Sequence, residues 1–148
     1  MNKRTNTHVR SQRGFNLVEL MVAVAVVGIL GMVAYPSFLD SVRQSRRTDA
    51  HTALMLASNN LERFFAANNT YTTDTSAIGF DVDGGVSYSE GGHYTVAVAA
   101  GSSGIASSYV VTVAAASGDG QQQDTGCTSL TIDSTGRRTP DPNTSDCW

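Results

Sequence analysis

One carboxylate borders the longest apolar stretch of the chain. The run Leu20–Ala34 contains only apolar residues and glycines, and Glu19 directly precedes it. A carboxylate placed in lipid without a partner costs several kcal/mol. Glu19 therefore needs a positively charged partner, unless it lies early enough in the span for its carboxylate to reach the membrane surface.

The two cysteines, Cys127 and Cys147, form the second candidate site. Neither belongs to a CxxC motif or to a Cys/His cluster, which argues against a zinc site. A pair that encloses about 20 residues fits a disulfide formed in an oxidising compartment, with a stabilisation of about 3 kcal/mol. Two free buried thiols are the alternative.

Other candidate sites do not have the spacing that their chemistry requires. Asp81 and Asp83 with Glu90 resemble part of a calcium loop, but glycines occupy the fifth and twelfth positions, where an EF-hand needs ligands. His51 and His93 are isolated, and we expect surface or strand positions for them. No GxSxG motif accompanies the serines. We therefore predict no enzyme activity, no metal and no cofactor.

The charge balance argues against nucleic acid as a partner. The chain has 10 basic and 13 acidic residues; removal of the four basic residues of segment 1–14 leaves 6 against 13, a net charge of −7. Nucleic-acid binders usually show the opposite balance. Arg137 and Arg138, near Trp148, could contact DNA, but two adjacent arginines are more often a solvated turn. We therefore do not expect DNA to be a partner.

A long N-terminal helix would carry Glu19. Phe15–Tyr35 is long enough to cross a bilayer as a helix, which takes about 20 residues. From Ser37 to Asn68 apolar residues recur every three or four positions, which predicts an amphipathic continuation. The recurring residues are Ala50, Leu54, Ala57, Leu61 and Phe65. A cleaved secretory signal is the competing interpretation, but Met32 fits its small-residue pattern poorly.

Three strands are expected after the helix. His93–Ala100 and Ser108–Ala115 alternate in polarity around a Gly/Ser-rich link, which predicts an antiparallel hairpin. Cys127–Asp133 predicts a third strand. We expect Thr70–Gly92 to be a loop with a short strand or helical turn, and Ser117–Gly126 to be an exposed polar segment.

The N-terminal region resembles the prepilin motif of type IV pilins. The resemblance rests on the run Arg13-Gly14-Phe15-Asn16-Leu17-Val18-Glu19-Leu20, in which Gly, Phe and Glu occupy the family's positions. Asn16 departs from the threonine more often found there. Gly28 and Pro36 also lie where type IV pilins carry helix-loosening residues. The resemblance implies an α+β fold, with a long N-terminal helix packed on a small antiparallel sheet.

Several functional expectations follow from this resemblance. A prepilin peptidase would cleave between Gly14 and Phe15 and methylate the new amine of Phe15. Glu19 would then pair with the N-terminal amine of a neighbouring subunit during pilus assembly. The implied organisation is a leader (1–14), a transmembrane and filament-core segment (15–36) and an exposed domain (37–148) with a disulfide loop.

The same resemblance implies partners and a location. The partners are other pilin subunits, the prepilin peptidase and the inner-membrane pilus assembly machinery. A single span would anchor the chain in the bacterial inner membrane, with the C-terminal domain periplasmic, before it enters an extracellular pilus. Residues near Tyr35, Arg46 and the cysteines further resemble PilE-type minor pilins. A type II secretion pseudopilin and a DNA-binding competence pilin are the alternatives.

Overall fold

The computed structural model describes residues 14–118, 120–140 and 145–148. The basic residues of the predicted leader lie outside these ranges. The chain divides into two compact units, one ending at Phe38 and the other running from Leu39 to Trp148. Each unit is described by itself below.

Helix α1 (Leu17–Asn68) contains 52 residues and includes Pro36 within its range. The sequence predicted a helix over nearly this range. In the first unit every described residue up to Phe38 is exposed. This part of α1 is long and apolar enough to cross a membrane.

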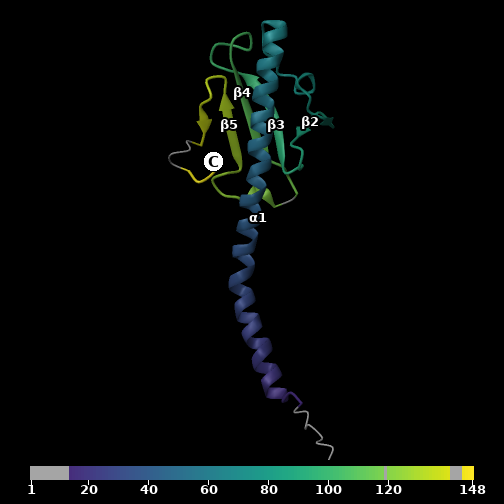
Figure 1. Ribbon diagram of the computed structural model, residues 1–148, viewed down its shortest axis with the longest axis vertical. Coiled ribbons are helices and arrows are strands. Elements are labelled where there is room, and N and C mark those ends of the chain that lie inside the picture. Colours follow the sequence, from purple (N-terminus) through teal and green to yellow (C-terminus); the bar gives the residue numbers. More distant parts are fainter. Residues whose placement is uncertain (1–13, 119, 141–144) are drawn as a thin grey trace, which may run out of the picture. The chain divides into compact units, whose positions relative to one another are not determined.

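The remainder of α1 contributes one face of the core of the second unit. Ala50, Leu54, Ala57 and Leu61 are each at most 1% exposed, and they lie on the face that the apolar periodicity predicted. Phe65, the last residue of the predicted stripe, is only partly buried. Figure 1 shows the central strands lying against this part of α1.

Six antiparallel strands form a single sheet in which spatial order follows chain order. Strands β1 and β6 are therefore its opposite edges. The strands are β1 (Val82–Asp83), β2 (Val86–Tyr88), β3 (Tyr94–Ala100), β4 (Tyr109–Ala115), β5 (Ser129–Asp133) and β6 (Arg138–Thr139). The expected fold class, a long helix packed on a small antiparallel sheet, is confirmed.

The predicted hairpin is the centre of this sheet. Strands β3 and β4 pair from Tyr94 opposite Ala115 to Ala100 opposite Tyr109. Alternate residues of both strands face α1 and are buried, because successive side chains in a strand point to opposite faces. The third predicted strand is β5, whose Leu130 is fully buried.

The structure differs from the sequence prediction in the connecting segments. The segment Thr70–Gly92 holds the short helix η1 (Ser76–Ile78) as well as β1 and β2. Ser117–Gly126 was predicted to be an exposed polar segment, and most of its described residues are exposed. It also contains the short helix η2 (Gln121–Gln123), and the side chains of Gln121 and Asp124 are buried, which was not predicted.

Replacing Leu54 with alanine should destabilise the second unit by about 2–5 kcal/mol, because it removes buried methyl groups and leaves a cavity. Leu54 is 1% exposed, whereas the neighbouring Met55 is 55% exposed. Met55→Ala is therefore the matched control and should cost well under half as much. Chemical denaturation followed by fluorescence of the single tryptophan, Trp148, measures both variants. Equal losses of stability in Leu54→Ala and Met55→Ala would contradict the assignment of Leu54 to the buried face of α1.

Candidate functional site

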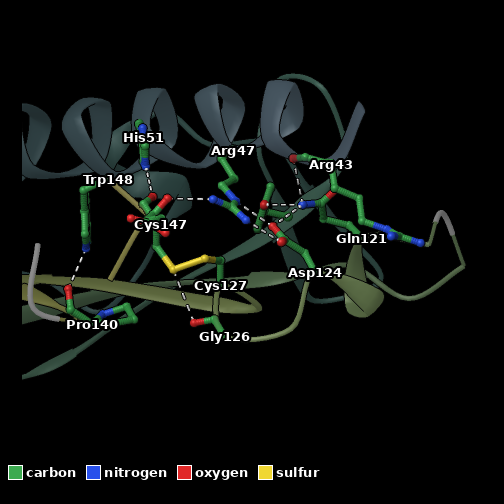
Figure 2. The surroundings of a disulfide bond; sticks show 12 residues. Arg43, Arg47, His51, Gln121, Asp124, Gly126, Cys127, Pro140, Cys147 and Trp148 are labelled. Atoms are coloured by element: carbon green, nitrogen blue, oxygen red, sulfur yellow. Dashed lines mark hydrogen bonds and ion pairs between the residues drawn. A yellow bond between two sulfur atoms is a disulfide. The ribbon is translucent and has the colours of Figure 1, made fainter. Parts of the chain in front are cut away.

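Three polar side chains on α1 face the segment that follows β4 and the C-terminal residues. Arg43, Arg47 and His51 are spaced four residues apart, so they share one side of the helix. Each contacts the segment between β4 and β5 or the residues next to Cys147. We call these three residues the helix clamp; Figure 2 shows them above the disulfide.

Arg47 makes the most extensive contacts of the helix clamp. Its Nε and Nη2 donate to the two carboxylate oxygens of Asp124 at 2.8 and 2.6 Å, and its Nη1 donates to the carbonyl oxygen of Asp146 at 2.7 Å. The side chains of Arg47 and Asp124 are 16% and 6% exposed. The hydrogen bond to Asp124 raises the pKa of Arg47 above its ordinary value.

Gln121 extends this network into the core. Its side chain is fully buried, and its Nε2 donates to the hydroxyl of Tyr94 at 2.8 Å and to Asp124 at 3.1 Å. The same nitrogen donates to the backbone carbonyl oxygen of Arg43 at 3.2 Å. Burial raises the pKa of the Tyr94 hydroxyl to about 12. The network thus ties η2 to both α1 and β3.

The other end of the helix clamp holds the residues beside the second cysteine. His51 Nε2 lies 2.8 Å from the carbonyl oxygen of Cys147, and its ring stacks on Trp148 with centroids 5.2 Å apart. The predicted disulfide between Cys127 and Cys147 is present, with Cα atoms 5.4 Å apart. Both cysteines are buried. His51, expected at a surface or strand position, is a partly buried residue of α1 that contacts the C-terminal residues.

The turn between β5 and β6 presents two arginines at the sheet edge. Asp133 Oδ1 accepts hydrogen bonds from the backbone N–H groups of Thr135 and Arg137 at 2.9 and 3.0 Å. Gly136 has φ +81°, a left-handed conformation that glycine adopts without strain. The Arg137 side chain is 82% exposed. The Arg138 guanidinium lies 5.1 Å from the centre of the Trp148 ring.

The predicted processing residues lie in the first unit. Gly14, Phe15 and Glu19 are all exposed, and a Cβ atom added to Gly14 would meet nothing within 4 Å. Glu19 lies in the first turn of α1. A carboxylate is electrostatically favourable there, because the helix N-terminus carries a partial positive charge. Among the described residues, no group of three or more His, Cys, Asp or Glu side chains could hold a metal ion.

Two protein families match this chain. The family described as "Type IV minor pilin ComP, DNA uptake sequence receptor" matches residues 36–131, and "Prokaryotic N-terminal methylation motif" matches residues 9–35. Our expectation that DNA is not a partner conflicts with the first description. That expectation relied on the net charge and on the interpretation of Arg137 and Arg138 as a solvated turn.

Individual relatives are also pilins or related secretion proteins. The type IV major pilin protein PilA of Myxococcus xanthus is 36% identical over 89 residues, which cover 60% of this chain and 39% of that protein. Fimbrial protein EcpC of Eikenella corrodens is 29% identical, covering 46% and 44%. Type II secretion system core protein G of Dickeya chrysanthemi is 26% identical, covering 47% and 46%. The matched region thus spans less than half the length of these relatives.

One solved structure is similar at the level of the backbone. It is a type IV pilin from Shewanella oneidensis, with a TM-score of 0.49 and 20% sequence identity. The alignment covers 72% of this chain and 97% of that structure.

Replacing Arg47 with alanine should destabilise the second unit by about 3–5 kcal/mol, because it leaves the buried Asp124 carboxylate without its partner. Arg47→Lys should recover only part of this loss, since lysine cannot form the two-point contact. Arg63→Ala, which removes an exposed arginine of the same helix, is the control and should change stability little. Chemical denaturation of the three variants measures the effect. If Arg63→Ala lowers stability as much as Arg47→Ala does, the assigned role of the Arg47–Asp124 ion pair would be contradicted.

Stability should decline at alkaline pH because two tyrosines are buried. Burial raises the pKa of Tyr94 and of Tyr109 to about 12, above the ordinary value of 10. The folded state therefore favours the neutral phenols. This contribution is complete below pH 10 and is lost as the pH rises towards 12.

Denaturation curves recorded across this pH range measure the loss. Tyr109→Phe keeps the ring but removes one titrating group, so its stability should fall less steeply with pH. An identical slope for the variant and the original chain would contradict the assignment.

Proposed function

Because the chain belongs to the type IV minor pilin family, we propose that it is a minor pilin whose displayed domain binds double-stranded DNA. The observation that carries this proposal is the match of residues 36–131 to the family described as a DNA uptake sequence receptor. That match covers most of the second unit. It also favours a minor pilin over a type II secretion pseudopilin. The narrower resemblance to PilE-type minor pilins stays a prediction.

In this proposal the first unit serves processing and assembly. A prepilin peptidase cleaves between Gly14 and Phe15 and methylates the amine of Phe15, in keeping with the match to the methylation motif over residues 9–35. The exposed apolar part of α1 anchors the chain in the bacterial inner membrane and later packs among other pilin subunits. Glu19 pairs there with the N-terminal amine of a neighbouring subunit, which satisfies its need for a partner in an apolar environment.

The second unit is the displayed part. It has its own core and its own disulfide, and its described residues form every strand of the sheet. A disulfide persists in the oxidising periplasm and outside the cell. This unit would therefore keep its structure both at the inner membrane and in an extracellular pilus, where DNA can reach it.

The mature protein should begin at Phe15 with a methylated amine, and mass spectrometry of the isolated chain measures this directly. Glu19→Ala should leave that cleavage intact but lower the amount of the chain in sheared pili, because the docking charge is lost. Glu90→Ala, which removes an exposed carboxylate of the second unit, is the control and should leave incorporation unchanged. A different N-terminus would overturn the processing assignment, and normal incorporation of Glu19→Ala would overturn the docking role.

The processed chain in detergent should bind double-stranded DNA at low salt. Raising the salt concentration from about 50 to 200 mM should weaken binding, because counterions released from the phosphates contribute to the affinity. A fluorescence anisotropy titration with a labelled duplex measures both effects. No binding at the lowest salt concentration would remove DNA from the proposal and leave a structural minor pilin.

A further inference from the structure

Negative and positive side chains lie at opposite edges of the sheet. Residues 74–90, which supply β1 and β2, contain four acidic residues and no lysine or arginine; these are Asp74, Asp81, Asp83 and Glu90. All four side chains are exposed. Arg137 and Arg138 lie at the β6 edge. The net charge of the chain therefore does not describe the surface at β6.

The distance between the two edges exceeds the range of electrostatic repulsion in salt. Six strands at a spacing of about 4.8 Å place the edges roughly 24 Å apart. The Debye length is about 8 Å at physiological ionic strength, so exposed charges at β1 are largely screened at β6. A polyanion at the β6 edge would experience little repulsion from the acidic edge.

Among the described residues near β6, Asp133 and Asp146 each have an arginine beside them. Asp133 accepts two backbone hydrogen bonds from its own turn and lies 3.4 Å from Arg137 Nε. Because Arg137 is 82% exposed, this ion pair is weak and a phosphate can replace Asp133 as its partner. Asp146 lies beside Arg47, whose Nη1 donates a hydrogen bond to its backbone carbonyl oxygen at 2.7 Å.

The partly buried Trp148 holds Arg138 in place. One face of its ring stacks on His51 with an interplanar angle of 7°, and the guanidinium of Arg138 lies over the ring at 5.1 Å. The indole N–H donates to the carbonyl oxygen of Pro140 at 2.6 Å, as Figure 2 shows. The hollow between these side chains is small, about 60 Å³.

We propose that the β5–β6 turn is the DNA contact of this chain, with Arg137 and Arg138 binding backbone phosphates of a duplex. Trp148 is a positioning residue that fixes Arg138 and does not itself touch DNA. The turn is rigid because Asp133 and Gly136 define its geometry, so little conformational entropy is lost on binding. This inference rests on the proposed function and names the residues through which it acts.

The test compares duplex affinity and its salt dependence for the processed full-length chain and its variants in detergent. Arg137→Ala and Arg138→Ala should each weaken binding about tenfold, as loss of one charge-assisted hydrogen bond does. Each should also lower the slope of log K against log salt by about 1, the signature of one lost phosphate contact. Arg63→Ala removes the same charge from α1 and should change neither quantity.

Trp148 is tested by two substitutions. Trp148→Ala should weaken binding towards the level of Arg138→Ala, whereas Trp148→Phe should restore it, because phenylalanine keeps a ring beneath the guanidinium. A purely structural role for Trp148 would lower thermal stability and leave the salt slope unchanged. If Trp148→Ala does not fold, the two arginine variants still decide the proposal.

The outcomes separate this inference from the proposed function. If the original chain binds no duplex, the DNA part of the proposed function fails. If the original chain binds and both arginine variants bind equally well, only the assignment of the β5–β6 turn fails. If Arg63→Ala weakens binding and lowers the slope as much as Arg137→Ala does, the contact depends on overall charge, and the assignment is again overturned.

Discussion

The partly buried ion pair between Arg47 and Asp124 determines where the segment after β4 lies. A polar segment normally remains in solvent, since its side chains lose hydration when they are buried. Here the guanidinium contacts both carboxylate oxygens of Asp124, and Gln121 adds a hydrogen bond to the same carboxylate. Because Asp124 precedes Cys127 by only three residues, the ion pair also fixes the first cysteine near α1. Cys147 then lies within reach of both Cys127 and His51.

This arrangement connects α1 to the surface that we assign to DNA. Arg47 and His51 hold the backbone of Asp146 and Cys147, and the next residue, Trp148, supports Arg138. The disulfide keeps this segment in place. The helix clamp thus gives the β6 edge a fixed geometry, although β6 itself contains only two residues. An isolated strand of that length has little stability of its own.

Local periodicity explains which parts of the fold could be predicted from the sequence. The apolar stripe from Ala50 to Leu61 and the alternation in β3 and β4 are repeated several times, so each predicts both an element and its buried face. Strands β1 and β6 have two residues each and offer no such repetition. The disulfide was predictable because the chain has only two cysteines, and neither belongs to a metal-binding motif.

The helix clamp could not be predicted in the same way. The spacing of Arg43, Arg47 and His51 shows that they share a helix face, but not what that face meets. Their partners outside α1 lie 77 to 99 residues away along the chain. The Nε2 of the buried Gln121 donates to Tyr94 and Asp124, and these contacts exist only in the tertiary structure. The expectation against DNA, which conflicts with the matched family description, had a related weakness. A net charge carries no information about which edge of a sheet its charges occupy.

The central claim is that DNA contacts this domain at the β5–β6 turn. An NMR titration of the isotopically labelled, processed chain in detergent micelles with a DNA duplex tests it most directly. The single indole N–H, that of Trp148, provides a well-resolved reporter. We predict shifts in residues 134–139 and in the Trp148 indole, with residues 81–90 unchanged. Shifts in residues 81–90, with the β5–β6 turn and the indole unaffected, would contradict the account.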